Sequence, residues 1–333
     1  DYSDDWTAWE NVVVNEVENT VTANDVDAGT GQWALAVKYN QTYVPDDNFE
    51  QALIDLGYDD TLDDYVLTAN ISGVTNLVVN EKEISDLTGI EDFTALEDLR
   101  CADNPLTSLN IDNNTNLTYL NFSRNDLTSI DLTNNVLLTN LYCEKNQLNS
   151  LDVSNNSSLI VLECNDNQLT TLDLSNNTEL TYLKCYVNQL TALDVSANTA
   201  LTELYCWSNE LTSLDVSSNT ALTFFDCSDN QLTNLDVSAN TAITTLNCWS
   251  NELTSLDVSA NTALFYLSCS SNELTSLDVS ANTALFYLSC SSNQLTALDV
   301  SSNTALAFLY CNGNDITSLD VSANTPLTYL NCE

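Results

Sequence analysis

Cysteine recurs at a fixed interval over most of this chain. All eleven cysteines stand on one 21-residue grid that runs from Cys101 to Cys332, and Phe122 fills the only vacant position on it. A fixed period of this length indicates a repeat architecture, in which each coil contacts only its neighbours. The 333 residues are therefore better interpreted as one elongated body than as two compact domains.

Each repeat consists of two similar halves. In the unit that begins at Leu201, LTELYCWSNELTSLDVSSNTA, leucine occupies positions 1, 4, 11 and 14, cysteine position 6, valine position 16, and asparagine positions 9 and 19. Apolar residues with a period of two predict a short strand with one buried face in each half. The asparagines are suited to turn the backbone and to bond free backbone groups of the next coil.

These halves resemble the leucine-rich repeat, LxxLxLxxN/CxL, and the unit is similar to that of internalin-like and Bacteroidetes-type secreted proteins. The resemblance implies a leucine-rich-repeat solenoid over residues 76–333 with about twelve units. Its LxxLxC strands would form a parallel β-ladder on the concave face, and its LxxLDV halves a short second ladder on the convex side. We expect slight curvature, because no helix wedges the coils apart.

A helical cap is expected over residues 43–75. The segment 45–57 places three apolar residues on one helical face: Phe49, Leu53 and Leu56. Asp46 or Asp47 is available as the N-cap, and Gly57 as the stop. Such a helix would cover the open end of the solenoid core.

The two ends of the chain carry weaker signals. Residues 1–42 alternate apolar and polar residues around Val12–Val14 and Trp33–Tyr39, which predicts an appended hairpin. The chain starts at Asp1 without a signal segment, as a mature or trimmed chain would. It stops in mid-unit at Cys332-Glu333 without a polar cap. Either the repeats continue, or the open end of the solenoid binds another molecule, which includes end-to-end self-association.

The net charge of −42 restricts the partners. Against 48 acidic residues there are 6 basic ones and no histidine, so affinity for nucleic acid or anionic membrane is excluded. No apolar run is long enough to cross a bilayer, so no membrane insertion is expected. Cations, neutral glycans and basic proteins remain, and solubility in a salty medium would explain the charge equally well.

The cysteines are expected to be free thiols. Each occupies an inward strand position, where sulfur packs as a small hydrophobe between leucines, and Phe122 in the same slot favours packing over bonding. A few disulfides between adjacent coils, or a role in metal binding or catalysis, stay open as alternatives.

The concave strand offers a candidate binding face. Positions 3, 5 and 7 point outward, vary most, and are rich in aromatic residues. Exposed aromatic residues at this density are typical of surfaces that bind protein or sugar. We predict a ligand site formed by Tyr186, Tyr205, Trp207, Phe224, Trp249 and Tyr266. The alternative for rings at position 3 is that they cover the rim of the core.

Basic residues are confined to one half of this face. Arg100, Arg124, Lys145 and Lys184 fall on or beside it, and no basic residue follows Lys184. They either bind an acidic ligand group or relieve repulsion among neighbouring carboxylates.

Two acidic features are candidate cation sites. Position 15 is aspartate from Asp131 to Asp320, and stacked carboxylates repel one another unless hydrogen bonds, retained protons or cations offset their charge. The second feature is a cluster near the cap: Asp59, Asp60, Asp63 and Asp64. No cofactor is required, and calcium is the one ion that these oxygen-rich groups would suit.

Catalysis is not predicted, because the carboxylates repeat along a surface instead of converging in a pocket. The blocks Asn251–Ser271 and Asn272–Ser292 are identical, and duplicating a whole coil suits binding or display. We predict an adhesion scaffold that engages a protein or glycan, secreted or on the outer surface of a bacterium as the resemblance implies. The alternatives are a cell-surface spacer stabilised by calcium or salt, and a glycan-active enzyme that uses a carboxylate pair.

Overall fold

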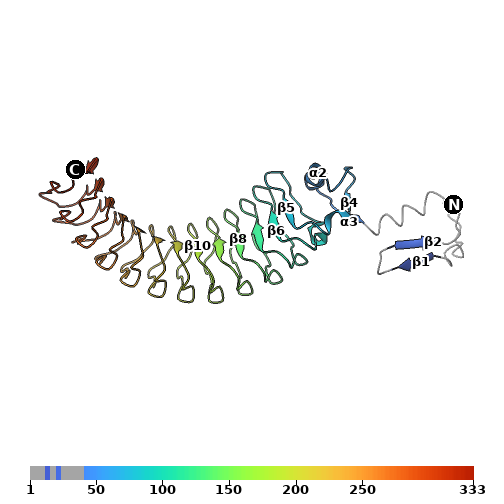
Figure 1. The fold of residues 1–333 in the computed structure, drawn as a ribbon, viewed down its shortest axis with the longest axis horizontal. Helices are drawn as coiled ribbons and strands as arrows, with labels where there is room; N and C mark the ends of the chain where they lie inside the picture. Colours follow the sequence, from blue (N-terminus) through green and yellow to red (C-terminus); the bar gives the residue numbers. More distant parts are fainter. Residues whose placement is uncertain (1–11, 16–19, 24–40) are drawn as a thin grey trace.

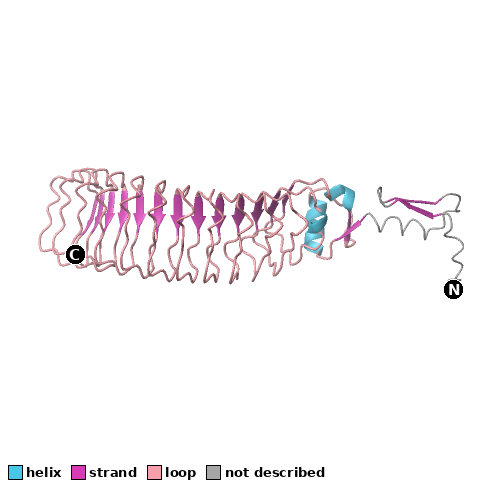
Figure 2. Ribbon diagram, turned by 90° about the horizontal axis from the view of Figure 1, so that it is seen from below, coloured by secondary structure: helices cyan, strands magenta, loops and turns pink. Residues whose placement is uncertain are grey.

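The computed structural model describes residues 12–15, 20–23 and 41–333, and most of these form a solenoid. One parallel sheet of thirteen strands runs along it, each strand hydrogen-bonded to the next in sequence. The coils follow an open arc with this sheet on the inner side (Figure 1), and the strands lie side by side along its whole length (Figure 2). The leucine-rich-repeat solenoid predicted from the sequence is confirmed.

The strands of the sheet are three residues long. Their bounds are β5 Asn76–Val78, β6 Asp98–Arg100, β7 Tyr119–Asn121, β8 Asn140–Tyr142, β9 Val161–Glu163, β10 Tyr182–Lys184, β11 Glu203–Tyr205, β12 Phe224–Asp226, β13 Thr245–Asn247, β14 Tyr266–Ser268, β15 Tyr287–Ser289, β16 Phe308–Tyr310 and β17 Tyr329–Asn331.

The pairing register follows the 21-residue grid everywhere except at its first strand. Tyr182 pairs with Glu203, for example, so that equivalent positions of successive coils lie side by side. Strand β5 pairs with β6 at a separation of 22 residues, with Asn76 opposite Asp98, and buried Val79 takes the place of a cysteine. This thirteenth strand does not fit the cysteine grid, which has twelve positions.

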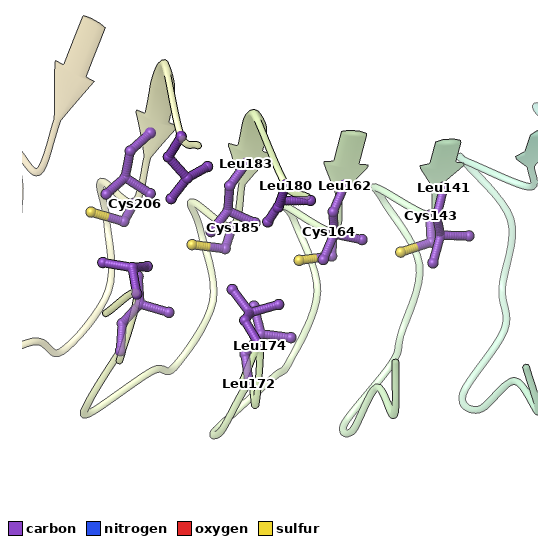
Figure 3. Packing of buried hydrophobic residues seen from close by; sticks show 14 of the residues in the cluster. Leu141, Cys143, Leu162, Cys164, Leu172, Leu174, Leu180, Leu183, Cys185 and Cys206 are labelled. Carbon is purple, nitrogen blue, oxygen red and sulfur yellow. The ribbon is translucent and has the colours of Figure 1, made fainter. Parts of the chain in front are cut away.

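The core is a stack of similar layers. In a typical coil Leu201, Leu204, Cys206, Leu211 and Val216 are fully buried. Burying one leucine side chain stabilises a protein by about 1.5–3 kcal/mol, so each coil adds a similar increment against its neighbours. Figure 3 shows the layers formed by Leu141, Cys143, Leu162 and Cys164 following one another at the same depth.

The convex half corrects one prediction. Positions 13–16 of the coils are not hydrogen-bonded as strands in residues 41–333, so the expected second β-ladder is absent there. Turns follow position 16, and their backbone N–H groups bond to acceptors within the same coil. Asn219 N–H donates to Val216 O, and Ser217 N–H donates to the Asp215 carboxylate. Leucine and valine are buried on this side without strand pairing, because alternating burial requires only an extended backbone.

The asparagines bond backbone groups as expected, although their partners lie in the preceding coil and their own. Asn209 accepts a hydrogen bond from Leu190 N–H at 3.0 Å and donates to the carbonyls of Cys185 and Cys206 at 3.1 Å. At position 19, Asn219 donates to Val195 O and Asn198 O, each at 2.9 Å. Two ladders of amides thus tie every coil to the previous one.

The cap consists of β3 (Gln41–Tyr43), α2 (Asp47–Asp55), β4 (Tyr65–Leu67) and the short helix α3 (Thr68–Ile71), and the 3-10 helix η2 (Ile90–Asp92) follows in the first coils. Asp46 is the N-cap of α2, as the sequence allowed, and Gly57 follows the helix with φ of +80°. Phe49 and Leu53 are fully buried, but Leu56 is 45% exposed because the helix has already ended there.

The N-terminal segment contains one described hairpin. Strand β1 (Val12–Asn15) pairs antiparallel with β2 (Thr20–Ala23), so the first of the two predicted strands is present, but this partner was not predicted. The second, Trp33–Tyr39, lies outside the described residues. No helix in the described part of the chain is long and apolar enough to cross a membrane.

Candidate functional site

The outward positions of the concave sheet are half-buried, because neighbouring coils press their side chains together. In β10, β11 and β12 the first and third residues are partly exposed and the middle residue is buried. Side chains at equivalent positions therefore form rows along the solenoid. These rows bring the predicted ligand-binding residues into defined groups.

Four of the six predicted residues form two stacked pairs on adjacent coils. Tyr186 and Trp207 lie with ring centroids 4.3 Å apart and an interplanar angle of 11°. Tyr205 and Phe224 lie 4.5 Å apart at 28°, and Tyr205 also contacts Tyr182 at 5.7 Å. We call Tyr182, Tyr186, Tyr205, Trp207 and Phe224 the central aromatic group.

The other two predicted residues lie outside this group. Trp249 is 40% exposed, and the coil between it and Trp207 carries Ser228 at the same position. Tyr266 stacks instead on Tyr287, at 4.2 Å and 5°. The six residues thus share one face but do not form one continuous patch.

A second aromatic group extends towards the end of the sheet. Phe265 and Phe286 lie parallel, with centroids 4.9 Å apart and an interplanar angle of 3°, and Phe265 is 50% exposed. They precede β14 and β15 at position 2, where most coils carry a threonine whose hydroxyl donates to the previous coil, as Thr244 does to Thr223 O. The sequence prediction missed both phenylalanines, although phenylalanine in a threonine row was a visible signal.

Carboxyl groups border the central aromatic group. Glu203 accepts a hydrogen bond from the Tyr205 hydroxyl at 2.7 Å. Burial, supported by this bond, raises the pKa of Tyr205. Burial also raises the pKa of Asp226, although Ser228 and Asn247 donate to its carboxylate. The group therefore combines flat apolar rings with acceptor oxygens.

Three of the four basic residues on this face are paired within the protein. Arg100 donates two hydrogen bonds to Asp98, at 3.0 and 2.8 Å, and lies 4.4 Å from the centroid of the Tyr119 ring. Arg124 lies 3.8 Å from Asp103, and Lys184 lies 3.3 Å from Glu163. This pairing supports the interpretation that they offset local negative charge.

The convex aspartates are held by hydrogen bonds. Each carboxylate from Asp131 to Asp320 accepts the backbone N–H two residues on at 2.9 Å, as Asp257 does from Ser259. Hydrogen bonds from the Ser259 hydroxyl and N–H lower the pKa of Asp257, so its carboxyl group is ionised at neutral pH. Retained protons therefore do not relieve the repulsion between these aspartates.

The predicted acidic cluster near the cap is divided. Asp59, Asp60 and Asp63 line a pocket of about 310 Å³ beside Tyr58 and Tyr65. Asp64 instead has a carboxylate oxygen within 4.8 Å of oxygens of Asp47 and Glu50, two residues of α2 that the sequence prediction did not include. Their three-residue spacing places Asp47 and Glu50 on one helical face, but only the fold brings Asp64 to them.

The cysteines are free thiols, and all except Cys332 are buried. Their sulfurs point the same way in successive coils (Figure 3), and Cys206 Sγ lies 3.5 Å from Asp226 O of the next coil. Burial raises the pKa of Cys101 and Cys248 to about 12, so these thiols are poor nucleophiles and poor metal ligands.

Comparison with known proteins agrees with this geometry. No protein-family model matches the chain, and no curated protein matches it by sequence. Among solved structures, it is similar to the functional domain of InlJ from Listeria monocytogenes, which includes a cysteine ladder: 36% identity, 88% of this chain, 75% of that chain, TM-score 0.70.

Two further structures share the fold. The internalin InlF of Listeria monocytogenes has 25% identity and a TM-score of 0.82, with 86% of this chain and 89% of that chain covered. A leucine-rich-repeat protein of Leptospira interrogans has 23% identity and a TM-score of 0.73, with 78% and 73% covered. With its 21-residue coils, its concave parallel sheet and its row of buried cysteines, the chain belongs to the internalin-like family of leucine-rich-repeat proteins.

Proposed function

We propose that this protein is a non-catalytic binding module whose concave aromatic face engages a protein or glycan ligand. The observation that carries the proposal is the stacked pair of Tyr186 and Trp207, which remains half-exposed on the sheet. Large aromatic side chains supply contact area at low cost in conformational entropy, and they are enriched among residues that dominate binding energies.

The rigidity of the sheet favours binding. Every strand beneath the central aromatic group is hydrogen-bonded on both sides, so the rings are already ordered before a ligand arrives. A preorganised surface loses less entropy on association than a mobile one. The InlJ and InlF structures are scaffolds of the same kind, which supports the assignment to binding.

Charge restricts the class of ligand. No basic residue follows Lys184, while Glu203 and Asp226 border the central aromatic group. A ligand at this face is therefore a neutral glycan or a protein surface with basic residues around an apolar centre. The same family relationship leads us to propose that the protein is secreted or displayed on the outer surface of a bacterium.

The test is a screen of the purified protein against glycan and protein arrays, followed by titration of any ligand found. Trp207→Ala and Trp249→Ala should each weaken binding at least tenfold. The unfolding transition should stay nearly unchanged in Trp249→Ala, whose side chain is exposed, and Trp207→Ala should lower the free energy of unfolding only by the roughly 0.5–1.5 kcal/mol of its stack with Tyr186 and the area that it buries. Leu137→Ala is a control, since Leu137 is 48% exposed but lies in the turn before β8 and not on the sheet. Equal affinity of all three variants and the wild type would contradict the proposal.

One observation favours a second candidate, a structural spacer. The identical blocks Asn251–Ser271 and Asn272–Ser292 add length without adding a new surface. If spacing is the function, the tryptophan variants leave the activity of the domain that the solenoid carries unchanged, and shortening the chain by one whole coil impairs that activity.

A further inference from the structure

A buried glutamate stands in the cap without a full set of partners. Glu50 is fully buried, and its Oε1 accepts hydrogen bonds from Asp63 N–H at 2.9 Å and Tyr65 N–H at 3.0 Å. Its Oε2 is buried and has no hydrogen-bond partner. Buried carboxylate oxygens are normally paired with a donor or a cation, because leaving them bare costs free energy.

The charged side chains grouped around Glu50 are acidic. One carboxylate oxygen each from Asp47, Glu50 and Asp64 lies within 4.8 Å of the other two. Asp59 contributes a second buried oxygen without a partner, Oδ2. Burial, together with the negative charges of Glu50, Asp63 and Asp60, raises the pKa of Asp59. Residues 41–81 contain no lysine or arginine, and Lys82, the next residue, is paired with Asp55 at 3.5 Å.

The spacing of these oxygens suits one cation. Ca²⁺ binds carboxylate oxygens at about 2.3–2.6 Å, so ligands on opposite sides of the ion are up to roughly 5 Å apart. The three oxygens fall within that limit. Asp47 and Asp64 are exposed, which leaves room for water to complete the six to eight oxygen ligands that Ca²⁺ takes.

We propose that Asp47, Glu50 and Asp64 bind one calcium ion in the cap. Asp47 and Glu50 belong to the first turns of α2, whereas Asp64 lies in the loop that leads into β4. The ion ties these two segments together. Phe49, between the two helical ligands, is fully buried with its ring 6.3 Å from that of Phe93, so the ion also fixes the helix over the end of the core.

A calcium titration with salt controls distinguishes a specific site from general screening of the negative charge of the chain. The full chain, freed of metal by chelation, is titrated with CaCl₂ in a calorimeter, and its thermal unfolding is followed in CaCl₂, MgCl₂ and NaCl at equal ionic strength. We expect a stoichiometry of about one and an increase in the Tm of cap unfolding of at least about 2 °C beyond that in NaCl.

Three isosteric variants and one control locate the ion. Glu50→Gln keeps the acceptor for Asp63 and Tyr65 N–H and removes the charge; Asp47→Asn and Asp64→Asn act at exposed positions, and asparagine tolerates the φ of +67° at residue 64. Each should abolish the calcium response or weaken it at least tenfold. Asp257→Asn on the convex side removes one charge elsewhere and should retain the response.

Two outcomes would overturn the site. One is a wild-type Tm that rises equally in CaCl₂ and in NaCl, which would mean that diffuse counterions suffice. The other is a calcium response in Asp47→Asn and Asp64→Asn equal to that of the wild type, a result that stands even if Glu50→Gln does not fold. Neither outcome bears on ligand binding at the concave face, which lies on other coils.

Discussion

The ring of Tyr186 lies flat against the indole of Trp207, with centroids 4.3 Å apart and planes 11° from parallel. Both residues occupy position 7, so the stack follows from the register that places equivalent positions of adjacent coils side by side. Burial raises the pKa of the Tyr186 hydroxyl. One contact between coils therefore contributes to the stability of the solenoid and also shapes the proposed binding face.

A double-mutant cycle measures this contact. Stacked aromatic pairs contribute about 0.5–1.5 kcal/mol beyond the area that they bury. Tyr186→Ala and Trp207→Ala should each lower the free energy of unfolding in urea, and the double variant should lose about 0.5–1 kcal/mol less than the sum. Tyr186→Ala with Trp249→Ala is the control pair and should be additive. Additive losses in both pairs would mean that the rings do not interact.

Val187, next to Tyr186, has a strained backbone. Its φ is +50°, in the left-handed region that β-branched residues avoid, whereas the equivalent residues include Ser208, Asp229 and Gly313. Val187→Asn should raise the free energy of unfolding by about 1 kcal/mol, because asparagine tolerates this conformation. Urea unfolding of the variant and the wild type checks this.

The reverse substitution is the matched control. Ser208 has a φ of +53° at the same position of the next coil. Ser208→Val should destabilise the protein by about the amount that Val187→Asn stabilises it. No change in either variant would show that the backbone relaxes at no cost.

The predictable part of the fold is the part that depends on alternation and register. A 21-residue period with period-two burial predicts inward cysteines, short strands and the row in which Tyr186 lies beside Trp207, because it leaves one arrangement for each position. Strand β5 lies within the predicted range of the solenoid but off the cysteine grid, because its spacing to β6 is 22 residues. The convex ladder was wrong because burial of Leu214 and Val216 does not require strand pairing.

The candidate sites were harder to predict than the fold. Trp249 and Tyr266 share a face with Trp207, but counting coils is needed to see that Ser228 interrupts the row. The grouping of Asp64 with Glu50 depends on where the loop before β4 meets α2. That contact is set by packing within the cap, and neither charge nor spacing in the sequence encodes it.

The buried thiols make stability fall with rising pH. Burial holds the pKa of Cys101 and Cys248 at about 12, whereas an unfolded chain ionises cysteine near pH 8.5. A folded-state pKa above the unfolded value means that stability is fully present below about pH 8.5 and is lost as the pH rises towards 12. Between these pH values each such thiol lowers the free energy of unfolding by up to about 1.4 kcal/mol per pH unit.

Urea unfolding between pH 7 and pH 10.5 tests this. Cys248→Ala should make the decline with pH shallower by the share of one thiol, whatever its effect at pH 7. Cys332→Ser is the control and should leave the slope unchanged, because Cys332 is exposed. A free energy of unfolding that stays constant up to pH 10 would contradict the raised pKa values.

Asp257 on the convex side makes both a favourable and an unfavourable interaction. Its Oδ1 accepts the Ser259 N–H at 2.9 Å, while Asp236 and Asp278 in the adjacent coils repel its charge. Asp257→Asn keeps an acceptor and removes the charge, whereas Asp257→Ala removes both. At pH 7 and low salt we expect the Tm to fall in the order wild type, Asn variant, Ala variant, because the lowered pKa of Asp257 means that its hydrogen bonds outweigh the repulsion. In 1 M NaCl the lead of the wild type over the Asn variant should grow, because the repulsion between carboxylates of adjacent coils is then screened within about 3 Å.

Acid should affect the wild type in a defined direction. The hydroxyl and N–H of Ser259 lower the folded-state pKa of Asp257 from 3.8, so the stabilisation is present above that value and is lost as the pH falls through the lower, folded-state pKa. The Tm difference between the wild type and Asp257→Ala should therefore shrink below about pH 4. A difference that stays constant from pH 6 to pH 2.5 would mean that the aspartate contributes through its shape and not through its charged, hydrogen-bonded form.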